Sequence, residues 1–379
     1  MPIRLAVAGL THGHVWGLLE QWAAQPEVEL VAVADPTPLL DNARARFQRA
    51  YVDWQRMLDA ESPDVVLACA DNRTSAAIAI EAMQRGAHAM VEKPMAADLA
   101  DAERMLETAR ATDRMLMINW PTRWNPAIHA LLERARRGEF GAVFEFRFRA
   151  GHAGPREIGC DPYFVEWLYD EQRNGAGALA DFACYGAVMS AYLLGEPLQV
   201  LGTRGNLTKD YPISDDNAVL VARYPKAIAV IEATWSQAGT DGAPNPIVYG
   251  TEATAGVIDG KLRIHRRNAE PAFETPRPCP KASATRPNTS SSACAQARTL
   301  KACLAPKSRL SPNESWKRSN KRNCRQPPAH QVSFRQEDDD DPARVELFGR
   351  AGRVAPACSG GSAARFALPT WRRRVGAGD

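Results

Sequence analysis

The chain has 379 residues, of which 45% are hydrophobic and 24% are charged. This length predicts about two or three domains and excludes a single small module. No apolar run approaches the ~20 residues that cross a bilayer, and the first residues lack the basic and apolar regions of a secretory signal. We therefore expect a cytoplasmic protein with no membrane partner.

The net charge of +3 conceals two regions of opposite charge. Residues 276–379 hold 20 Lys and Arg against 8 Asp and Glu, whereas residues 1–275 hold 27 against 36. The last region also has only 12 Ile, Leu, Val and Phe residues. That share lies below the ~20% at which chains fail to bury enough apolar surface to fold. The sequence therefore predicts an ordered part followed by a disordered C-terminal tail.

Short apolar runs alternate with helical patterns over the first 120 residues. This alternation predicts a domain at 1–120 with a doubly wound parallel sheet of Rossmann type, an α/β fold. Ligands of such sheets lie at the carboxyl ends of the strands. The expected strands are 4–10, 28–34, 65–70, 87–91 and 115–119, and the expected helices are 15–24, 39–49, 74–85 and 98–111, the last with Asp98 as N-cap.

After residue 120 the pattern predicts a second domain, 121–275, which is α+β with an open, mostly antiparallel sheet. Phe144, Phe146 and Phe148 alternate with charged residues, which is typical of a strand with one buried face. The expected helices are 127–137 and 177–194, and the expected strands are 143–149, 218–224, 227–236 and 256–264.

A glycine-rich turn, Gly9-Leu-Thr-His-Gly-His-Val-Trp-Gly17, joins the first expected strand to the first helix. Such a turn lets backbone N–H groups approach a pyrophosphate. Thr11 and His14 occupy the second and third glycine positions of the usual pattern, with His12 and Gly13 between them. The turn therefore predicts a dinucleotide site with an altered loop.

Asp35 ends the second expected strand, 26 residues after the loop begins. A carboxylate at this position can bind an adenosine ribose and would repel a 2′-phosphate, so NAD is favoured over NADP. The alternative is that Asp35 only starts a turn before Pro36.

Two more segments carry candidate chemistry. In Val91-Glu92-Lys93-Pro94 the lysine follows a buried strand and is expected to point into the cleft, the alternative being a surface lysine in a loop. Asp181 and Tyr185 lie four residues apart in an expected helix, so both can reach one substrate hydroxyl. The alternative is that Tyr185 is a core aromatic and Asp181 an exposed acid. The seven His show no convincing ligand spacing, so we expect no metal.

Together these segments resemble the glucose-fructose oxidoreductase and inositol 2-dehydrogenase family of NAD(P)-dependent oxidoreductases, over residues 3–265. The resemblance also rests on Asn72, Asn119, Arg123-Trp-Asn-Pro126, the helix entry at 175–185, and segments 215–224 and 248–252. It implies a homo-oligomer formed across the open sheet face. It further implies cofactor binding by Gly9, Thr11, His12, Gly13, His14, Asp35, Asn72, Glu92 and Lys93.

The resemblance implies that Lys93 is the catalytic lysine, and that Asp181, Tyr185 and Arg123 contact a sugar, polyol or diol substrate. Three positions depart from the family. Most members have His where this chain has Tyr185 and Ser75, and a second loop glycine where it has Thr11, although the glucose-fructose oxidoreductase branch also uses Tyr at the first position.

We therefore expect an oxidoreductase that transfers a hydride between a secondary alcohol and nicotinamide. Tyr185 is the expected base, with its pKa lowered by the Lys93 ammonium, while Asp181 orients the hydroxyl. The alternative is a non-catalytic protein of the same fold that binds a dinucleotide or a sugar, which the altered glycine loop would suit.

The basic tail has three interpretations. A reading-frame shift near residue 270 would leave the second domain incomplete and explain the abrupt change in composition. A nucleic-acid-binding tail would use its positive charge, but its aromatic residues are too scattered for a stacking platform, so we expect no nucleic acid partner. The third interpretation is an ordinary disordered extension.

Overall fold

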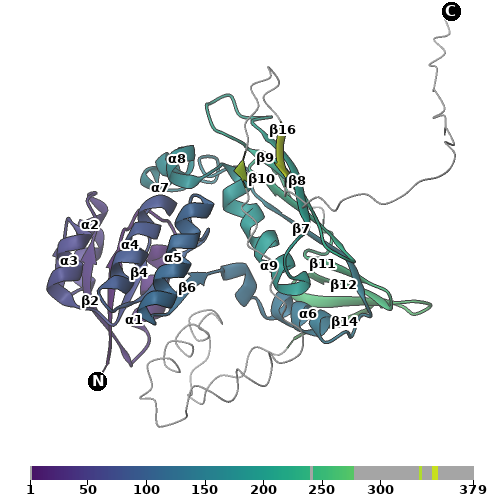
Figure 1. Ribbon diagram of the computed structural model, residues 1–379, viewed down its shortest axis with the longest axis horizontal. Coiled ribbons are helices and arrows are strands. Elements are labelled where there is room, and N and C mark those ends of the chain that lie inside the picture. The colour runs from purple at the N-terminus through teal and green to yellow at the C-terminus, as the bar shows by residue number, and fades with distance from the viewer. Residues whose placement is uncertain (1, 240–241, 277–332, 335–343, 349–379) are drawn as a thin grey trace, which may run out of the picture.

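The computed structural model describes residues 2–239 and 242–276, together with two short strands at 333–334 and 344–348. The side chains of Arg123, Trp124 and those two strands lie outside this description, as does the rest of the expected tail. Within the described residues the chain forms two sheets, each with its own helices (Figure 1).

The first sheet has six parallel strands in the order β3-β2-β1-β4-β5-β6. The order reverses between β1 and β4, and this reversal opens a crevice at their carboxyl ends. The strands are β1 (Ile3–Ala8), β2 (Val28–Ala34), β3 (Arg49–Tyr51), β4 (Val65–Ala68), β5 (His88–Glu92) and β6 (Leu116–Asn119). The doubly wound parallel sheet is therefore confirmed.

The helices around this sheet are α1 (Val15–Ala23), α2 (Leu39–Ala43), α3 (Trp54–Glu61), α4 (Asn72–Gln84) and α5 (Leu99–Thr112). Asp98 caps α5 as expected, since its carboxylate accepts a hydrogen bond from the Asp101 N–H at 2.8 Å.

The single helix expected at 39–49 is wrong. α2 passes into a short 3-10 turn (Arg44–Arg46), the backbone becomes extended at Phe47, and β3 follows. Two side chains of the edge strand β3 anchor it, because the Arg49 guanidinium and the Tyr51 hydroxyl both donate to the buried Glu61. These contacts are long-range, so the local apolar pattern gives no sign of them.

The second sheet has the order β14-β13-β12-β11-β7-β10-β9-β8-β16-β15 and is antiparallel except for the β10–β7 pair. The run expected as one strand at 256–264 is two strands, because Asp259 and Gly260 turn the chain with positive φ of 48° and 71°. The strands are β7 (Val143–Gly151), β8 (Gln199–Gly205), β9 (Asn217–Arg223), β10 (Ile228–Thr234), β11 (Ile247–Gly250), β12 (Ala253–Ile258), β13 (Lys261–Arg266), β14 (Ala272–Glu274), β15 (Ser333–Phe334) and β16 (Arg344–Phe348).

Helices cover one face of the second sheet, the face toward the first domain in Figure 1. Phe146, Phe148 and Trp235 are buried beneath them. The covering elements are α6 (Pro126–Arg136), a π-helical turn (Leu179–Ala183) and α9 (Cys184–Leu194), and a 3-10 turn (Pro121–Trp124) precedes α6, whereas α7 (Pro162–Leu168) and α8 (Glu171–Asn174) lie beside the first domain, where α8 packs on α4 (Figure 1). The helix expected at 177–194 thus opens with a π-turn, a feature common at functional sites.

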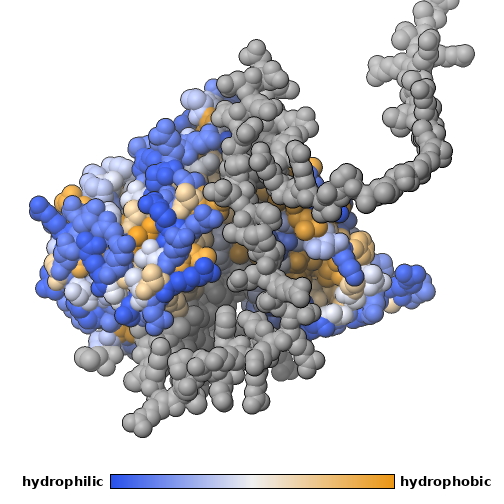
Figure 2. Space-filling model, viewed as in Figure 1, coloured by the Kyte–Doolittle hydropathy of each residue, from blue (hydrophilic) through white to orange (hydrophobic). Residues whose placement is uncertain are grey.

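The other face of this sheet carries apolar side chains that no described helix covers. Leu201, Val221 and Ile228 are 45%, 38% and 46% exposed. Phe144 is 47% exposed, so the expected buried stripe of three phenylalanines holds only for two of them. Figure 2 shows hydrophobic residues over the second sheet, beside the atoms drawn in grey.

One helical stretch, Glu171–Leu194, is long and apolar enough by length and composition to cross a membrane. Of its most apolar part, 44% is buried inside the protein. It also contains Asp181, whose carboxylate is buried and paired, and its helical type changes at the π-turn. These features are typical of a core helix that packs against a sheet.

Candidate active site

Lys93 follows β5 at the carboxyl edge of the first sheet, and its side chain reaches the second domain. Its ammonium donates to the Asp181 backbone oxygen at 3.1 Å and forms an ion pair with the Asp181 carboxylate. Both residues are buried, with 4% and 6% of their surface exposed. The alternatives of a surface lysine and an exposed acid are therefore wrong.

Asp181 is fixed from two sides. Its backbone lies in the π-turn, whose start is held by Asp215, which accepts hydrogen bonds from the Gly177 and Leu179 N–H groups at 2.9 and 2.7 Å. Gly177 must be glycine, because a Cβ there would lie 2.0 Å from the Asp215 carbonyl oxygen. The Trp235 indole N–H donates to Asp181 Oδ2 at 3.0 Å, so both carboxylate oxygens have a protein donor.

Tyr185 is buried between the two domains. Its ring centroid lies 5.4 Å from Lys93 Nζ, 6.0 Å from the Trp120 ring and 6.4 Å from the Phe148 ring. It is therefore a core aromatic that also faces the lysine. In the part of the chain that the structure describes, its hydroxyl has no hydrogen-bond partner.

Lys93, Asp181 and Tyr185 form a trio in which the lysine and aspartate charges compensate each other beside the neutral phenol. Burial alone would lower the pKa of Lys93, but the Asp181 carboxylate raises it overall. Burial alone would raise the pKa of Asp181, but Lys93 and the Trp235 hydrogen bond hold it below its usual value. Lys93 does lower the pKa of Tyr185, as expected, but burial of the phenol raises this pKa by more, so the expected net lowering is wrong.

The glycine loop begins with a position that only glycine can fill. Gly9 has φ of +88°, and a Cβ there would lie 2.4 Å from the Ala70 backbone nitrogen. That nitrogen donates to the Ser75 hydroxyl at 3.1 Å. Ser75, which departs from the family pattern, therefore holds the chain after β4 against the loop.

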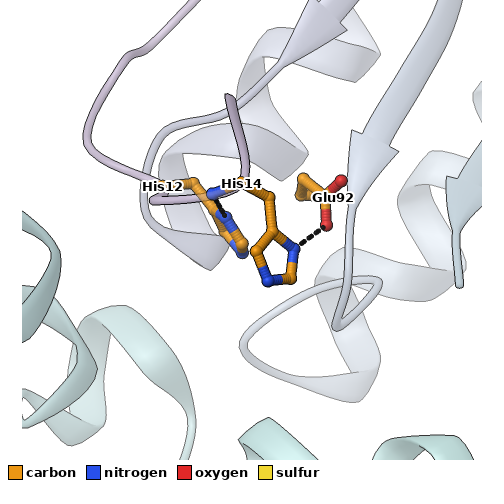
Figure 3. A group of neighbouring side chains, drawn as sticks. All are labelled: His12, His14 and Glu92. Atoms are coloured by element: carbon orange, nitrogen blue, oxygen red, sulfur yellow. Dashed lines mark hydrogen bonds and ion pairs between the residues drawn. The ribbon is translucent and has the colours of Figure 1, made fainter. Parts of the chain in front are cut away.

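His12, His14 and Glu92 converge where the loop meets the end of β5 (Figure 3). His14 Nδ1 lies 3.0 Å from Glu92 Oε2, and His12 accepts from the His14 N–H at 3.3 Å. The other His12 nitrogen lies 3.2 Å from the Lys93 carbonyl oxygen. The glycine loop is thus bonded to the side chain of Glu92 and to the backbone of Lys93.

Among the described residues, these three form a group that could hold a metal ion, because their donor atoms lie within 4.8 Å of one another. Both His12 nitrogens already have partners, so an ion would have to displace them. Burial lowers the pKa of His12 to about 3, which keeps its ring neutral. Burial alone would raise the pKa of Glu92, but the hydrogen bonds from His14 and Asn119 lower it overall.

Aromatic residues of α7 close over the loop from the second domain. The His12 ring lies 5.0 Å from the Phe164 ring and 5.7 Å from the Trp167 ring. The Trp167 indole N–H donates to the Thr11 carbonyl oxygen at 3.4 Å, and a Cβ on Gly13 would meet Phe164 at an ordinary 3.5 Å. The glycine loop and the second domain are therefore in direct contact through α7.

Asp35, Asn72 and Arg123 were expected to contact the cofactor or the substrate, and each has a different environment. Asp35 accepts from the Leu10 N–H at 2.6 Å and the Thr37 N–H at 2.7 Å, so it both supports the glycine loop and starts a turn. The Asn72 amide donates to Asn174 of the second domain at 2.7 Å, so this group joins the domains. The side chain of Arg123 lies outside the described residues.

Three residues of this region were not expected from the sequence. Trp235 orients Asp181, Asp215 anchors the π-turn, and His152 lies beside Phe182 with ring centroids 5.0 Å apart. Each sits near the end of a β-strand or in a loop, far along the chain from its partner. No local pattern signals such pairings, although Asp215 belongs to a segment that carried the family resemblance.

Two family models match the chain, and together they cover well over half of it. Residues 3–120 match the GFO/IDH/MocA model described as an oxidoreductase family with an NAD-binding Rossmann fold. Residues 128–256 match the model of the GFO/IDH/MocA C-terminal domain.

Similar proteins include a levoglucosan dehydrogenase of Pseudarthrobacter phenanthrenivorans, 27% identical over 61% of this chain and 65% of the relative. A myo-inositol 2-dehydrogenase of Thermotoga maritima is 24% identical over 58% and 61%. The chain thus spans less than two thirds of these relatives' length. A solved levoglucosan dehydrogenase in complex with NADH and levoglucosan has the same fold, with a TM-score of 0.66, 21% identity and coverage of 80% and 90%.

Proposed function

Because the chain belongs to the GFO/IDH/MocA oxidoreductase family, we propose that it transfers a hydride between a sugar or polyol carbon and a nicotinamide dinucleotide. The observation that carries the proposal is the Lys93–Asp181 ion pair beside Tyr185, at the carboxyl ends of the parallel strands. A buried ammonium that contacts a carboxylate and faces a phenol is costly to maintain for stability alone.

The loop region fits a dinucleotide. α1 starts with no side-chain cap and no acidic residue in its first turn, so its N-terminal dipole and N–H groups suit a pyrophosphate. The residues proposed to hold it are Gly9, Thr11, His12, Gly13 and His14, with Asp35 near the adenosine ribose and Glu92 behind the loop. The carboxylate of Asp35 supports NAD rather than NADP. When bound, the cofactor would supply or accept the hydride.

The trio would act on the oxygen of the reacting carbon. Lys93 is held charged by Asp181, so it can donate a hydrogen bond to that oxygen and stabilise negative charge that develops there. Tyr185 exchanges the proton, and Asp181 positions the lysine and accepts from a neighbouring substrate hydroxyl. Arg123, in the turn before α6, is proposed as a further substrate contact.

Two measurements test this function. Binding of NADH to the full chain is measured first by fluorescence, and absorbance at 340 nm is then followed with NAD and a panel of polyols that includes levoglucosan and myo-inositol. Turnover that is lost in Lys93→Met, while NADH binding persists, supports the proposal. NADH binding without turnover of any sugar or polyol favours the alternative, a binding protein of the same fold.

We also propose that the open face of the second sheet binds a second copy of this chain. Val221 pairs in register with Leu201 on β8 and with Val230 on β10, so the exposed apolar side chains form one band. A single monomer rarely leaves such a patch in water. Light scattering should give a dimer or larger oligomer, and Val221→Lys should shift it toward the monomer.

A further inference from the structure

One short stretch of the second domain, residues 174–181, contacts the first domain at both of its ends. At its far end the Asp181 carboxylate forms the ion pair with the Lys93 ammonium. At its near end Asn174 and Gly175 contact the first domain at the start of α4 and at the turn that follows Lys93. The near end therefore bears on how the ion pair is aligned.

Asn174 is the last residue of α8 and is completely buried. Its Oδ1 and its backbone oxygen both accept from the Asn72 amide, at 2.7 and 3.0 Å. Its own amide nitrogen donates to the Leu168 carbonyl oxygen at 2.9 Å and to the carbonyl oxygen of Ala176. Both ends of this buried amide are thus bonded, so it cannot rotate away from Asn72 without leaving polar groups unpaired.

Gly175 lets the backbones of the two domains come together. It has φ of +94°, and a Cβ there would lie 2.1 Å from the Ala97 carbonyl oxygen. Ala97 lies between β5 and α5, four positions after Lys93. Only glycine fits at position 175 unless the turn after Lys93 or the whole second domain moves.

Charged side chains also join α4 to α8 beside this contact. The Arg73 guanidinium donates to the Gln172 carbonyl oxygen at 2.7 Å and pairs with Asp98, the N-cap of α5, at 3.1 Å. Arg173 of α8 pairs in turn with Asp71, the N-cap of α4, at 3.4 Å. These pairs are partly exposed, so each adds little stability. The buried contacts of Asn174 and Gly175 therefore dominate the junction.

We propose that Asn174 and Gly175 are positioning residues, which align the Asp181 carboxylate with Lys93 across the two domains. Asp215 fixes Gly177 to the second sheet, so Gly175 cannot yield by itself. A push between Gly175 and the turn after Lys93 must then change the position of the ammonium relative to the carboxylate. The inference rests on the proposed function and adds two residues that act through Asp181.

Gly175→Ala is the direct test, and Gly86→Ala is its matched control. Both glycines follow a helix with a left-handed φ, +94° and +90°, but nothing among the described residues lies within 4 Å of a Cβ at Gly86. Gly175→Ala in the full chain should lower kcat about a hundredfold, which is the usual cost of misplacing a reacting group by ~1 Å. Gly86→Ala should keep kcat. Neither change touches the glycine loop, so both variants should bind NADH as the wild type does.

The pH profile separates misalignment from loss of folded protein. A weaker ion pair raises the pKa of Asp181, so the acid limb of kcat should move to higher pH in Gly175→Ala and stay in place in Gly86→Ala. A variant that only contained less folded protein would keep the wild-type limb.

Urea unfolding tests the alignment without turnover, and also if Gly175→Ala fails to fold. Asn72→Ala removes the donor to Asn174. It should cost less stability in the Lys93→Met/Asp181→Asn variant than in the wild type, because the ion pair it helps to align is already gone. Substitutions at distant, independent sites are additive, as Gly86→Ala should be in the same two backgrounds.

A folded Gly175→Ala with the kcat of the wild type, an equal loss of kcat in Gly86→Ala, or additive unfolding by Asn72→Ala would overturn the inference alone. A wild type that binds NADH but turns over no sugar or polyol, while the unfolding remains non-additive, would refute the proposed function and leave the alignment of the ion pair supported.

Discussion

The indole nitrogen of Trp235 lies 3.0 Å from Oδ2 of Asp181, and this bond aligns the carboxylate with Lys93. Trp235 directly follows β10 and is fully buried, so its indole cannot turn away. A strand of the second sheet thereby orients an acid that meets a lysine from the first sheet. The site is complete only when both domains are in place.

Trp235→Phe should lower kcat about tenfold with little change in NADH affinity. The variant loses a hydrogen bond to a charged group, worth about 1.5–3 kcal/mol. Because that bond lowers the pKa of Asp181, its loss should move the acid limb of the rate profile to higher pH. Trp22→Phe is the control, since the Trp22 indole is equally buried but has no described hydrogen-bond partner. An unchanged acid limb would show that Trp235 only fills space.

Lys93→Met should abolish turnover by a hundredfold or more and destabilise the protein by about 3–5 kcal/mol, because Asp181 is left buried and unpaired. Adding Asp181→Asn should restore part of the stability but none of the activity. Urea unfolding of the two variants measures both effects. If Lys93→Met were as stable as the wild type, Lys93 and Asp181 would not form a buried ion pair.

The same ion pair predicts how stability depends on pH. The pKa of Asp181 is lowered by folding, so its contribution is present above its ordinary value of about 4 and is lost as the pH falls below it. The pKa of Lys93 is raised, so its contribution is complete below about 10 and is lost as the pH rises further. Unfolding free energies of the wild type and the double variant should therefore differ most between these limits.

Gly9→Ala should destabilise the protein by about 2–4 kcal/mol, because it combines a left-handed φ with a clash against Ala70. Gly13→Ala, in the same loop, meets Phe164 at normal contact distance and should unfold within a few degrees of the wild type. Thermal denaturation of this pair separates backbone strain from general sensitivity of the loop. Equal melting temperatures of the two variants would refute the requirement for glycine at position 9.

A chain that ends after residue 276 should fold and bind NADH, because every residue of the proposed site precedes that point. It keeps the contact of Arg134 with Glu274 of β14 at 2.6 Å, which closes the far edge of the second sheet. The shortened chain loses β15 and β16, of which β16 pairs with β8. A melting temperature equal to or above that of the full chain would show that these two strands add no stability to the second sheet. Loss of cooperative unfolding would show the opposite.

The parts of the fold that the sequence predicts are those written in local periodicity. β2 has the expected bounds, α1 ends one residue earlier than expected, and β5 is shifted by one residue at both ends, because each element has a clear apolar pattern of its own. β3 was missed because it is held by pairing with β2 and by the bonds of Arg49 and Tyr51 to Glu61, rather than by a local pattern of its own.

The site follows the same division. Lys93, Asp181 and Tyr185 could be chosen because the family resemblance pointed to positions at a strand end and one helical turn apart, and the structure brings all three together. Their protonation could not be predicted, because the pKa of a phenol depends on how deeply it is buried and on whether a nearby charge is already paired. Trp235 was missed for a related reason, since its bond to Asp181 spans 54 positions of the chain.

The π-turn at Leu179–Ala183 makes the spacing of this helix intolerant of insertion or deletion. Removing one residue there would convert the turn to regular α-helix and rotate everything downstream by about 100° about the axis. Tyr185 would turn away from Lys93 while the helix remained intact. Homologues that lack this bulge should therefore carry their proton-transfer group at a different offset from the acid, and an alignment that ignores it would pair the wrong residues.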